Sequence, residues 1–310
     1  MNLEKYTTIQ EDLQIIIDYF TEDDNTVEEA IDYVCKRTGV SKADYLAIMN
    51  STLEPTKYQL EAIYNFAYAN YLYLNEIRWQ SALDEYRSGQ TRVCTHGART
   101  FINGDIRLDA NGLGSEERKA IADYAGGESN DFGSGFYIGE DISQAGMFVG
   151  QEPNSSLYFL TFNPTKLKCA YFKVDLDWLL AIGLFRGKLS QYEGSKKLQS
   201  ILDYVDSSDF VYAPIADNKI FETIDSFISG DLTDEQCLHA LSATHLGYQY
   251  VLKTQACLDN LKVIDHMYYC QLEKEIYNKQ SEIETRTSLN KSIIAKHKYK
   301  EQGRYINEIL

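Results

Sequence analysis

The stretch DFGSGFYIGEDISQAGMFV at residues 131–149 decides how the second half of this sequence is interpreted. It combines a glycine-containing turn, the strand-like run FYIG and a segment that leads into a helix. Asp131-Phe132-Gly133 also occurs in protein kinases, but the sequence has neither a glycine-rich loop with a strand lysine nor an HRD motif. Gly133 and Gly135 form no dinucleotide fingerprint, because a strand and not a helix follows them.

Around this stretch, short runs rich in Tyr, Phe and Val alternate with turns that contain Gly, Asn, Asp or Pro. The runs are RVCTH, GFYIG, SLYFLTF, CAYFKV, FVYAPI and YQYVLKT. Helices are predicted between some of them, at 115–125, at 178–185, from Asn218 to Gly230, and after a capping box formed by Thr233 and Gln236. Strands and helices mix without strict βαβ alternation, which indicates an α+β fold.

Residues 1–86 predict an all-α domain in front of this part. Thr26 with Glu29 forms a capping box, and the helix that it opens ends at Gly39. A second helix begins at Ser41, so the pair is typical of a helix-turn-helix. Pro55 begins a longer helical pattern that continues to Leu74. The ensemble resembles the small five-helix domain of the lambda-repressor type.

The charge of this front domain argues against DNA binding. Between residues 4 and 85 there are 16 acidic and 6 basic side chains, and the candidate recognition helix SKADYLAIMN contains Lys42 as its one cation. DNA-binding domains need several Lys or Arg side chains against the phosphates. The formal net charge of −16 for the whole chain also disfavours anionic membranes. We therefore expect the front domain to contact protein, either an antitoxin-like partner or its own enzyme domain.

Further features indicate a cytoplasmic protein without a metal site. The six cysteines are scattered singly, with neither a CxxC pair nor a zinc spacing, as is typical of free thiols in a reducing compartment. His239 and His245 are six residues apart, which is not one helix face. The sequence shows no secretory signal and no apolar run long enough for a membrane span. Residues 266–310 are charged and predict a helical tail.

Three motifs remain, and their order is more informative than any one of them. They are THG at 95–97, the stretch at 131–149 and the late strand YQYVLKT at 248–254. With Gln144-Ala145 and the segment PIADN at 214–218, they resemble a bacterial family of domains of unknown function within the ADP-ribosyltransferase superfamily. Its members show HG at a strand end, then DFGxGFYxT with Gln-Ala, a PVADD-like segment and a DQ-containing strand. The resemblance covers residues 88–265.

This resemblance implies a split β-sheet with NAD, the substrate, in its cleft. His96 would hydrogen-bond the ribose next to adenine, Tyr137 would stack on nicotinamide, Gln249 would take the third catalytic position, and Gly97 would let NAD approach the backbone. Other residues expected at the cofactor are Phe132, Gly135 and Phe136, and further candidates are Asp131, Arg99, Arg186 and Asp217.

Gln249 departs from the superfamily pattern, in which this position is usually a catalytic Glu. Cleavage of the NAD glycosidic bond builds oxocarbenium character on the ribose, which a carboxylate stabilises best. A glutamine keeps the acceptor but loses the charge, which often costs on the order of 100- to 1000-fold in rate. Either a nearby carboxylate, Asp131 or Asp217, compensates, or the domain binds NAD without catalysis.

Structural interpretations of the same residues stay open at this point. His96 could be a strand-end histidine, Tyr137 could pack in the sheet, and Gln249 could be a polar residue of an edge strand. Arg99 and Arg186 could reach the NAD phosphates or belong to surface ion pairs. We expect an intracellular mono-ADP-ribosyltransferase of the toxin or conflict-effector type that modifies a macromolecular acceptor. The alternatives are a non-catalytic interaction protein and an NAD glycohydrolase.

Overall fold

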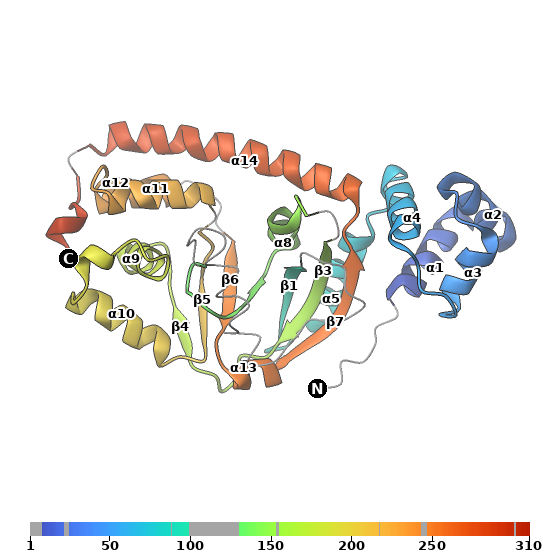
Figure 1. Ribbon diagram of the computed structural model, residues 1–310, viewed down its shortest axis with the longest axis horizontal. Helices are drawn as coiled ribbons and strands as arrows, with labels where there is room; N and C mark the ends of the chain where they lie inside the picture. The colour runs from blue at the N-terminus through green and yellow to red at the C-terminus, as the bar shows by residue number, and fades with distance from the viewer. Residues whose placement is uncertain are drawn as a thin grey trace. The chain divides into compact units, whose positions relative to one another are not determined.

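The computed structural model describes residues 8–21, 25–87, 89–98, 130–152, 155–216, 218–242, 247–300 and 302–310 (Figure 1). Its contacts divide the chain into two compact units. Unit 1 comprises Met1–Ile106, Ile142–Thr161 and Val263–Lys279, and unit 2 comprises Arg107–Asp141, Phe162–Lys262 and Gln280–Leu310. The three expected domains, 1–86, 88–265 and 266–310, stay a prediction.

Unit 1 begins with five helices. They are α1 (Thr8–Thr21), α2 (Val27–Thr38), α3 (Lys42–Met49), α4 (Lys57–Ala69) and α5 (Leu74–Tyr86). The capping box at Thr26 and Glu29 is confirmed, and Gly39 ends α2 in the left-handed conformation with φ 75°. The helical pattern from Pro55 to Leu74 is not one helix, because the chain leaves α4 after Ala69.

The rest of unit 1 is a small sheet with its helices. The strands β1 (Arg92–Ala98), β3 (Ser156–Phe162) and β7 (Leu261–Tyr268) lie in the order β1–β3–β7, and α8 (Ile142–Val149) and the start of α14 (Gln271–Lys298) accompany them. β7 continues through Tyr268, beyond the point where the helical tail was expected to begin.

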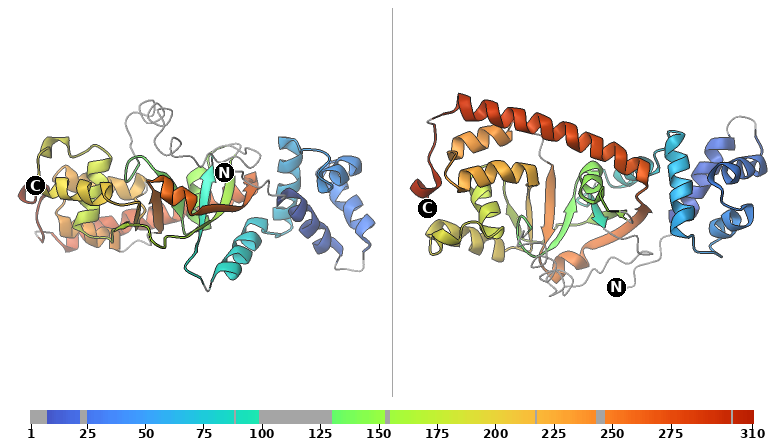
Figure 2. Two further views of the ribbon diagram at one scale, coloured as in Figure 1. Left: turned by 90° about the horizontal axis from the view of Figure 1, so that it is seen from below. Right: turned by 45° about the horizontal axis from the view of Figure 1, so that its top comes forward.

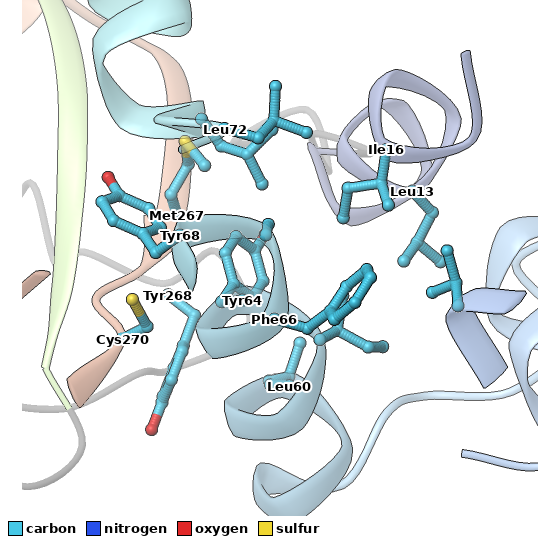
Figure 3. Close-up of a cluster of buried hydrophobic side chains, with 14 of the residues drawn as sticks. Leu13, Ile16, Leu60, Tyr64, Phe66, Tyr68, Leu72, Met267, Tyr268 and Cys270 are labelled. Atoms are coloured by element: carbon cyan, nitrogen blue, oxygen red, sulfur yellow. The ribbon is translucent and has the colours of Figure 1, made fainter. Parts of the chain in front are cut away.

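One apolar core joins the front helices of unit 1 to its strands. Figure 3 shows Tyr64 and Tyr68 of α4 beside Met267, Tyr268 and Cys270. The rings of Tyr64 and Tyr268 lie 6.0 Å apart. Because buried apolar area is the main source of stability, the front helices and β7 stabilise each other.

Unit 2 is a four-stranded mixed sheet with helices packed on it. The strands are β2 (Phe136–Gly139), β4 (Cys169–Tyr171), β5 (Phe210–Pro214) and β6 (Tyr248–Leu252), in the order β4–β5–β6–β2. The β4–β5 pair is parallel, whereas β5–β6 and β6–β2 are antiparallel. The helices are α9 (Leu176–Phe185), α10 (Lys196–Asp206), α11 (Asn218–Ile228), α12 (Asp234–Ser242), α13 (Gln255–Asp259) and two 3-10 turns, Ser190–Tyr192 and Ile306–Glu308. The mixture of helices with a mixed sheet confirms the expected α+β class.

The core of unit 2 lies on one face of this sheet. Figure 1 and the right view of Figure 2 show α9, α10 and α11 on one side of β4 and β5. Trp178 of α9 is fully buried, and its indole donates a hydrogen bond to the Pro214 carbonyl at 3.1 Å. The strand side chains Val211, Ala213 and Val251 face the same core. Gln249, two residues before Val251, belongs to the same face of the sheet.

The helical boundaries in unit 2 follow local signals. The capping box at Thr233 and Gln236 is confirmed by hydrogen bonds of 3.1 and 3.2 Å in the two directions. The expected helix at 115–125 lies outside the described residues. None of the described helices is long and apolar enough to cross a bilayer.

Candidate functional site

The turn at 130–135 is the best-defined part of the candidate site. Gly133 adopts φ 71°, in the left-handed region that favours glycine, and its N–H bonds the Asn130 carbonyl at 3.0 Å. A Cβ on Gly135 would lie 2.6 Å from Cγ1 of Val251, so only glycine fits where the turn meets β6. The two glycines of the DFGSG motif therefore serve the turn and its packing.

Asp131 lies at the centre of a buried polar cluster. Its carboxylate is 6% exposed and accepts hydrogen bonds from Arg186 Nε at 3.1 Å, from Arg186 Nη2 at 2.6 Å and from the Ala216 N–H at 2.8 Å. It also accepts a hydrogen bond from Gln249 Nε2 at 2.9 Å. Burial raises the pKa of Asp131, and the Arg186 charge opposes that shift. The hydrogen bonds from Arg186, Ala216 and Gln249 also act against the effect of burial on this pKa.

Arg186, directly after α9, makes several contacts with its guanidinium. Besides Asp131, its guanidinium donates to the Ala216 carbonyl and lies 4.3 Å from the centroid of the Phe221 ring. Its side chain is 9% exposed. Of the two interpretations of Arg186, the structure supports the ion pair, which is buried and not at the surface. Arg99 and Asp217 lie outside the described residues.

Tyr137 and Gln249 lie on one face of the β2–β6 pair. Gly139 is the register partner of Gln249, and Tyr137, two residues earlier on β2, has the same orientation as Gly139. The face is the one that carries the Asp131 cluster. Gln249 belongs to an inner strand between β5 and β2, so it is not a residue of an edge strand.

The Tyr137 hydroxyl is used within the protein. It accepts a hydrogen bond from the Phe132 N–H at 3.1 Å and donates to the Gly133 carbonyl at 2.7 Å. Tyr137 therefore braces the turn with its hydroxyl, and its half-buried ring packs at the edge of the unit 2 core. A hydroxyl in such a position is poorly suited to proton transfer, which requires contact with the reacting group.

Lys253 is a member of the site that sequence reasoning did not single out. Its ammonium donates to the carbonyls of Phe132 at 2.9 Å and Ser134 at 3.2 Å. Burial lowers the pKa of Lys253, and Asp206 opposes this effect. The sequence feature that could have identified Lys253 is its position in YQYVLKT. Strand alternation gives residue 253 the same orientation as Gln249.

Two residues that were expected at the cofactor are buried. Phe132 is fully buried, 5.3 Å from the Phe172 ring and 5.9 Å from the Phe185 ring between centroids. Phe136 is 1% exposed and, by strand alternation, faces away from Tyr137. Both aromatic rings are thus explained by packing.

His96 and Gly97 lie on β1, in unit 1. A Cβ on Gly97 would lie 2.6 Å from the Ala145 carbonyl oxygen and 3.0 Å from Val149 Cγ1, both in α8. The space beside Gly97 is therefore filled by α8. The His96 ring lies 6.5 Å from the Tyr158 ring between centroids.

The one cation of the candidate recognition helix is already engaged in ion pairs. Lys42, at the start of the candidate recognition helix α3, pairs with Glu28 at 3.0 Å and with Asp32 at 2.8 Å. A cation already paired with two carboxylates contributes little to phosphate binding. Among the described residues, no group of His, Cys, Asp and Glu side chains could hold a metal ion.

Comparison with known proteins found a family model that matches part of the chain. Residues 115–263 match the family described as Protein of unknown function (DUF3990), which is slightly less than half of the sequence. The matched segment contains Asp131, Tyr137, Arg186 and Gln249, whereas His96 precedes it. Comparisons with curated proteins and with solved structures found no significant match.

Proposed function

We propose that this protein is an NAD-dependent mono-ADP-ribosyltransferase in which Tyr137 and Gln249 contact the nicotinamide riboside. The observation that carries the proposal is the placement of Tyr137 and Gln249 on one face of paired strands, with Gln249 held by the buried Asp131 carboxylate. The split-sheet fold is part of the same proposal. The acceptor of ADP-ribose would be a macromolecule, and an antitoxin-like protein would restrain the enzyme.

The chemistry assigned to Gln249 follows from its hydrogen bond. Because Nε2 donates to Asp131, the amide oxygen is left as the acceptor for a ribose hydroxyl of the substrate. An acceptor held in advance stabilises the electron-poor ribose without reorganising during the reaction. Asp131 acts as a positioning residue, since its own charge is neutralised by Arg186. Turnover should be on the order of 100- to 1000-fold slower than with a free carboxylate at this position.

A second candidate function is NAD binding without turnover. The ion pair between Asp131 and Arg186 favours it, because it neutralises the carboxylate. Gln249 carries no charge, and the carboxylate beside it is already paired with Arg186. Within the described residues around Gln249, the charge that would best stabilise an oxocarbenium ion is therefore occupied. This arrangement suits a protein that recognises the nucleotide and signals its presence.

The experiment is nicotinamide release from NAD by the full chain, measured by chromatography, together with calorimetric titration of NAD. The test variants are Tyr137→Ala and Gln249→Ala. Tyr58→Ala serves as the control, because that ring is 81% exposed and lies in unit 1. Release by the wild type and by Tyr58→Ala, but not by the two test variants, supports the transferase.

The remaining outcomes separate the alternatives. Unchanged release in Tyr137→Ala and Gln249→Ala would remove the site assignment. Binding heat without release would favour the non-catalytic function, and no heat at all would end both proposals. Labelled NAD incubated with a cell lysate then identifies the acceptor, since it yields a labelled protein, a labelled nucleic acid or free ADP-ribose.

A further inference from the structure

The face of the unit 2 sheet opposite Gln249 carries a row of tyrosine rings. Tyr171 on β4 and Tyr212 on β5 stack at 5.9 Å between ring centroids, and Tyr212 and Tyr250 on β6 stack at 4.6 Å. Tyr248 adds a fourth ring at 5.0 Å from Tyr212. These four residues are here called the tyrosine row.

The strand register explains why the four rings share a face. Tyr171 is the register partner of Tyr212, and Tyr212 is the partner of Tyr250. Since side chains alternate along a strand, Tyr248 and Tyr250 point to one face and Gln249 between them to the other. The row is therefore separate from the Asp131 cluster and from the site proposed for NAD.

Glu140, directly after β2, closes one end of the row. Its Oε2 accepts a hydrogen bond from the Tyr212 hydroxyl at 3.1 Å, and its Oε1 accepts one from Tyr250 at 2.7 Å. Each carboxylate oxygen can accept a second hydrogen bond. The side chain is half-buried, and among the described residues no Lys or Arg pairs with it. The carboxylate is thus fixed in place without a counter-charge.

The row is partly open to solvent. Tyr171 is 52% exposed, Tyr212 and Tyr248 are half-buried, and Tyr250 is buried beside Glu140. Burial, and then the Glu140 charge, raise the pKa of the Tyr212 hydroxyl, and burial raises the pKa of Tyr248, so these two rings stay neutral at physiological pH. A ligand would thus meet neutral aromatic faces beside a fixed negative charge.

We propose that the tyrosine row and Glu140 bind an arginine side chain of a basic partner protein. A guanidinium is planar and stacks on aromatic faces, and its two parallel N–H groups match the two oxygens of a carboxylate. The acidic chain, with a net charge of −16, would attract a basic protein segment and repel the phosphates of a nucleic acid. The proposal does not depend on NAD chemistry.

Lysine fits this arrangement less well. Its ammonium is a compact, strongly hydrated charge that makes no bidentate contact with a carboxylate. A peptide with arginine should therefore bind more tightly than the same peptide with lysine. This preference distinguishes a built site from general attraction to an acidic protein, which would treat the two peptides alike.

The test uses the full chain and two fluorescein-labelled probes, Gly-Arg-Gly-Arg-Gly and Gly-Lys-Gly-Lys-Gly, with binding followed by fluorescence anisotropy. Glu140→Gln should weaken arginine-peptide binding about tenfold, because it removes charge-assisted hydrogen bonds. Tyr171→Ala should weaken it roughly threefold, the effect of an exposed cation–π contact. The controls are Glu193→Gln, an exposed carboxylate elsewhere in unit 2, and Tyr58→Ala.

Preference for arginine, with loss in the two test variants and none in the controls, supports the site. Equal binding of both peptides, or equal loss in test and control variants, overturns it. Absence of binding by either peptide also overturns it. Tyr171→Ala keeps the test valid if Glu140→Gln fails to fold, since the Tyr171 ring is mostly exposed.

Discussion

The side-chain amide of Gln249 donates a hydrogen bond to the carboxylate of Asp131 at 2.9 Å and joins two residues 118 positions apart. This contact links the DFGSG turn to the strand that was expected to supply the third catalytic residue. Because Asp131 is also paired with Arg186, the orientation of Gln249 depends on a buried ion pair. The first prediction tests that dependence.

Asp131→Asn should destabilise the protein strongly. The variant leaves the Arg186 guanidinium buried without its counter-charge, and removal of one partner of a buried pair typically costs about 3 kcal/mol or more. Urea unfolding measures the loss in free energy. The control is Asp225→Asn at an exposed position of α11, which should change the free energy by less than about 0.5 kcal/mol. Equal stability of both variants would contradict the assigned role of the ion pair.

Tyr137→Phe should separate the ring from the hydroxyl. The variant loses the two hydrogen bonds to the turn and should cost about 1–2 kcal/mol of unfolding free energy. It keeps the aromatic face, so nicotinamide release should persist, whereas Tyr137→Ala should abolish it. If Phe and Ala abolish release equally in folded protein, the hydroxyl and not the ring is the group that matters.

Gly97→Ala should destabilise unit 1 through its backbone contact with α8. The new Cβ would lie 2.6 Å from the Ala145 carbonyl oxygen, which cannot move without shifting the helix, and overpacking of this kind costs about 1–3 kcal/mol. Gly89→Ala is the matched control, since its nearest neighbour would be 3.7 Å away. Thermal unfolding compares the two, and a normal melting temperature for Gly97→Ala would show that α8 can retreat.

The stability of unit 1 should fall as the pH rises from 6 to 9. Glu273 is buried and accepts hydrogen bonds from the neutral groups of Tyr68 and Asn75, and burial raises its pKa to about 8. Glu76 raises this pKa further, and Lys274 opposes the shift. A raised pKa in the folded state means that the stabilisation is complete at acid pH and is lost as the pH passes about 8.

The variant Glu273→Gln tests this pH dependence. An uncharged amide keeps the acceptor for Tyr68, and its N–H can face the Asn75 Oδ1, which is buried without a hydrogen-bond partner. Unfolding free energies at pH 6 and pH 9 should therefore differ less in the variant than in the wild type. An identical difference in both proteins would show that Glu273 is not the group that titrates.

Several elements could be predicted from neighbouring residues alone. The capping box at Thr26 and Glu29 and the strand SLYFLTF at 156–162 were predicted correctly, because a cap and a strand pattern depend on residues a few positions apart. The break between α4 and α5 was missed. At this break Tyr71 adopts a φ of 62°, a backbone conformation that residues other than glycine rarely adopt.

The candidate site likewise has features that could be predicted from the sequence and features that could not. The resemblance carried by DFGSGFY and YQYVLKT implied Tyr137 and Gln249 as site residues. It could not indicate that the Tyr137 hydroxyl bonds the turn, or that Phe132 is core, because these roles depend on the exact path of the backbone.

The sequence by itself determined the class of the elements, the acidic character of the chain and the identity of the polar residues near the turn. Only the tertiary structure decided that Asp131 neutralises Arg186 and holds Gln249, that α8 fills the space beside Gly97, and that Glu140 lies at the end of the tyrosine row. The reason is physical. Caps, turns and alternation arise from interactions between near neighbours, whereas a buried ion pair between residues 55 positions apart leaves no periodic trace in the sequence.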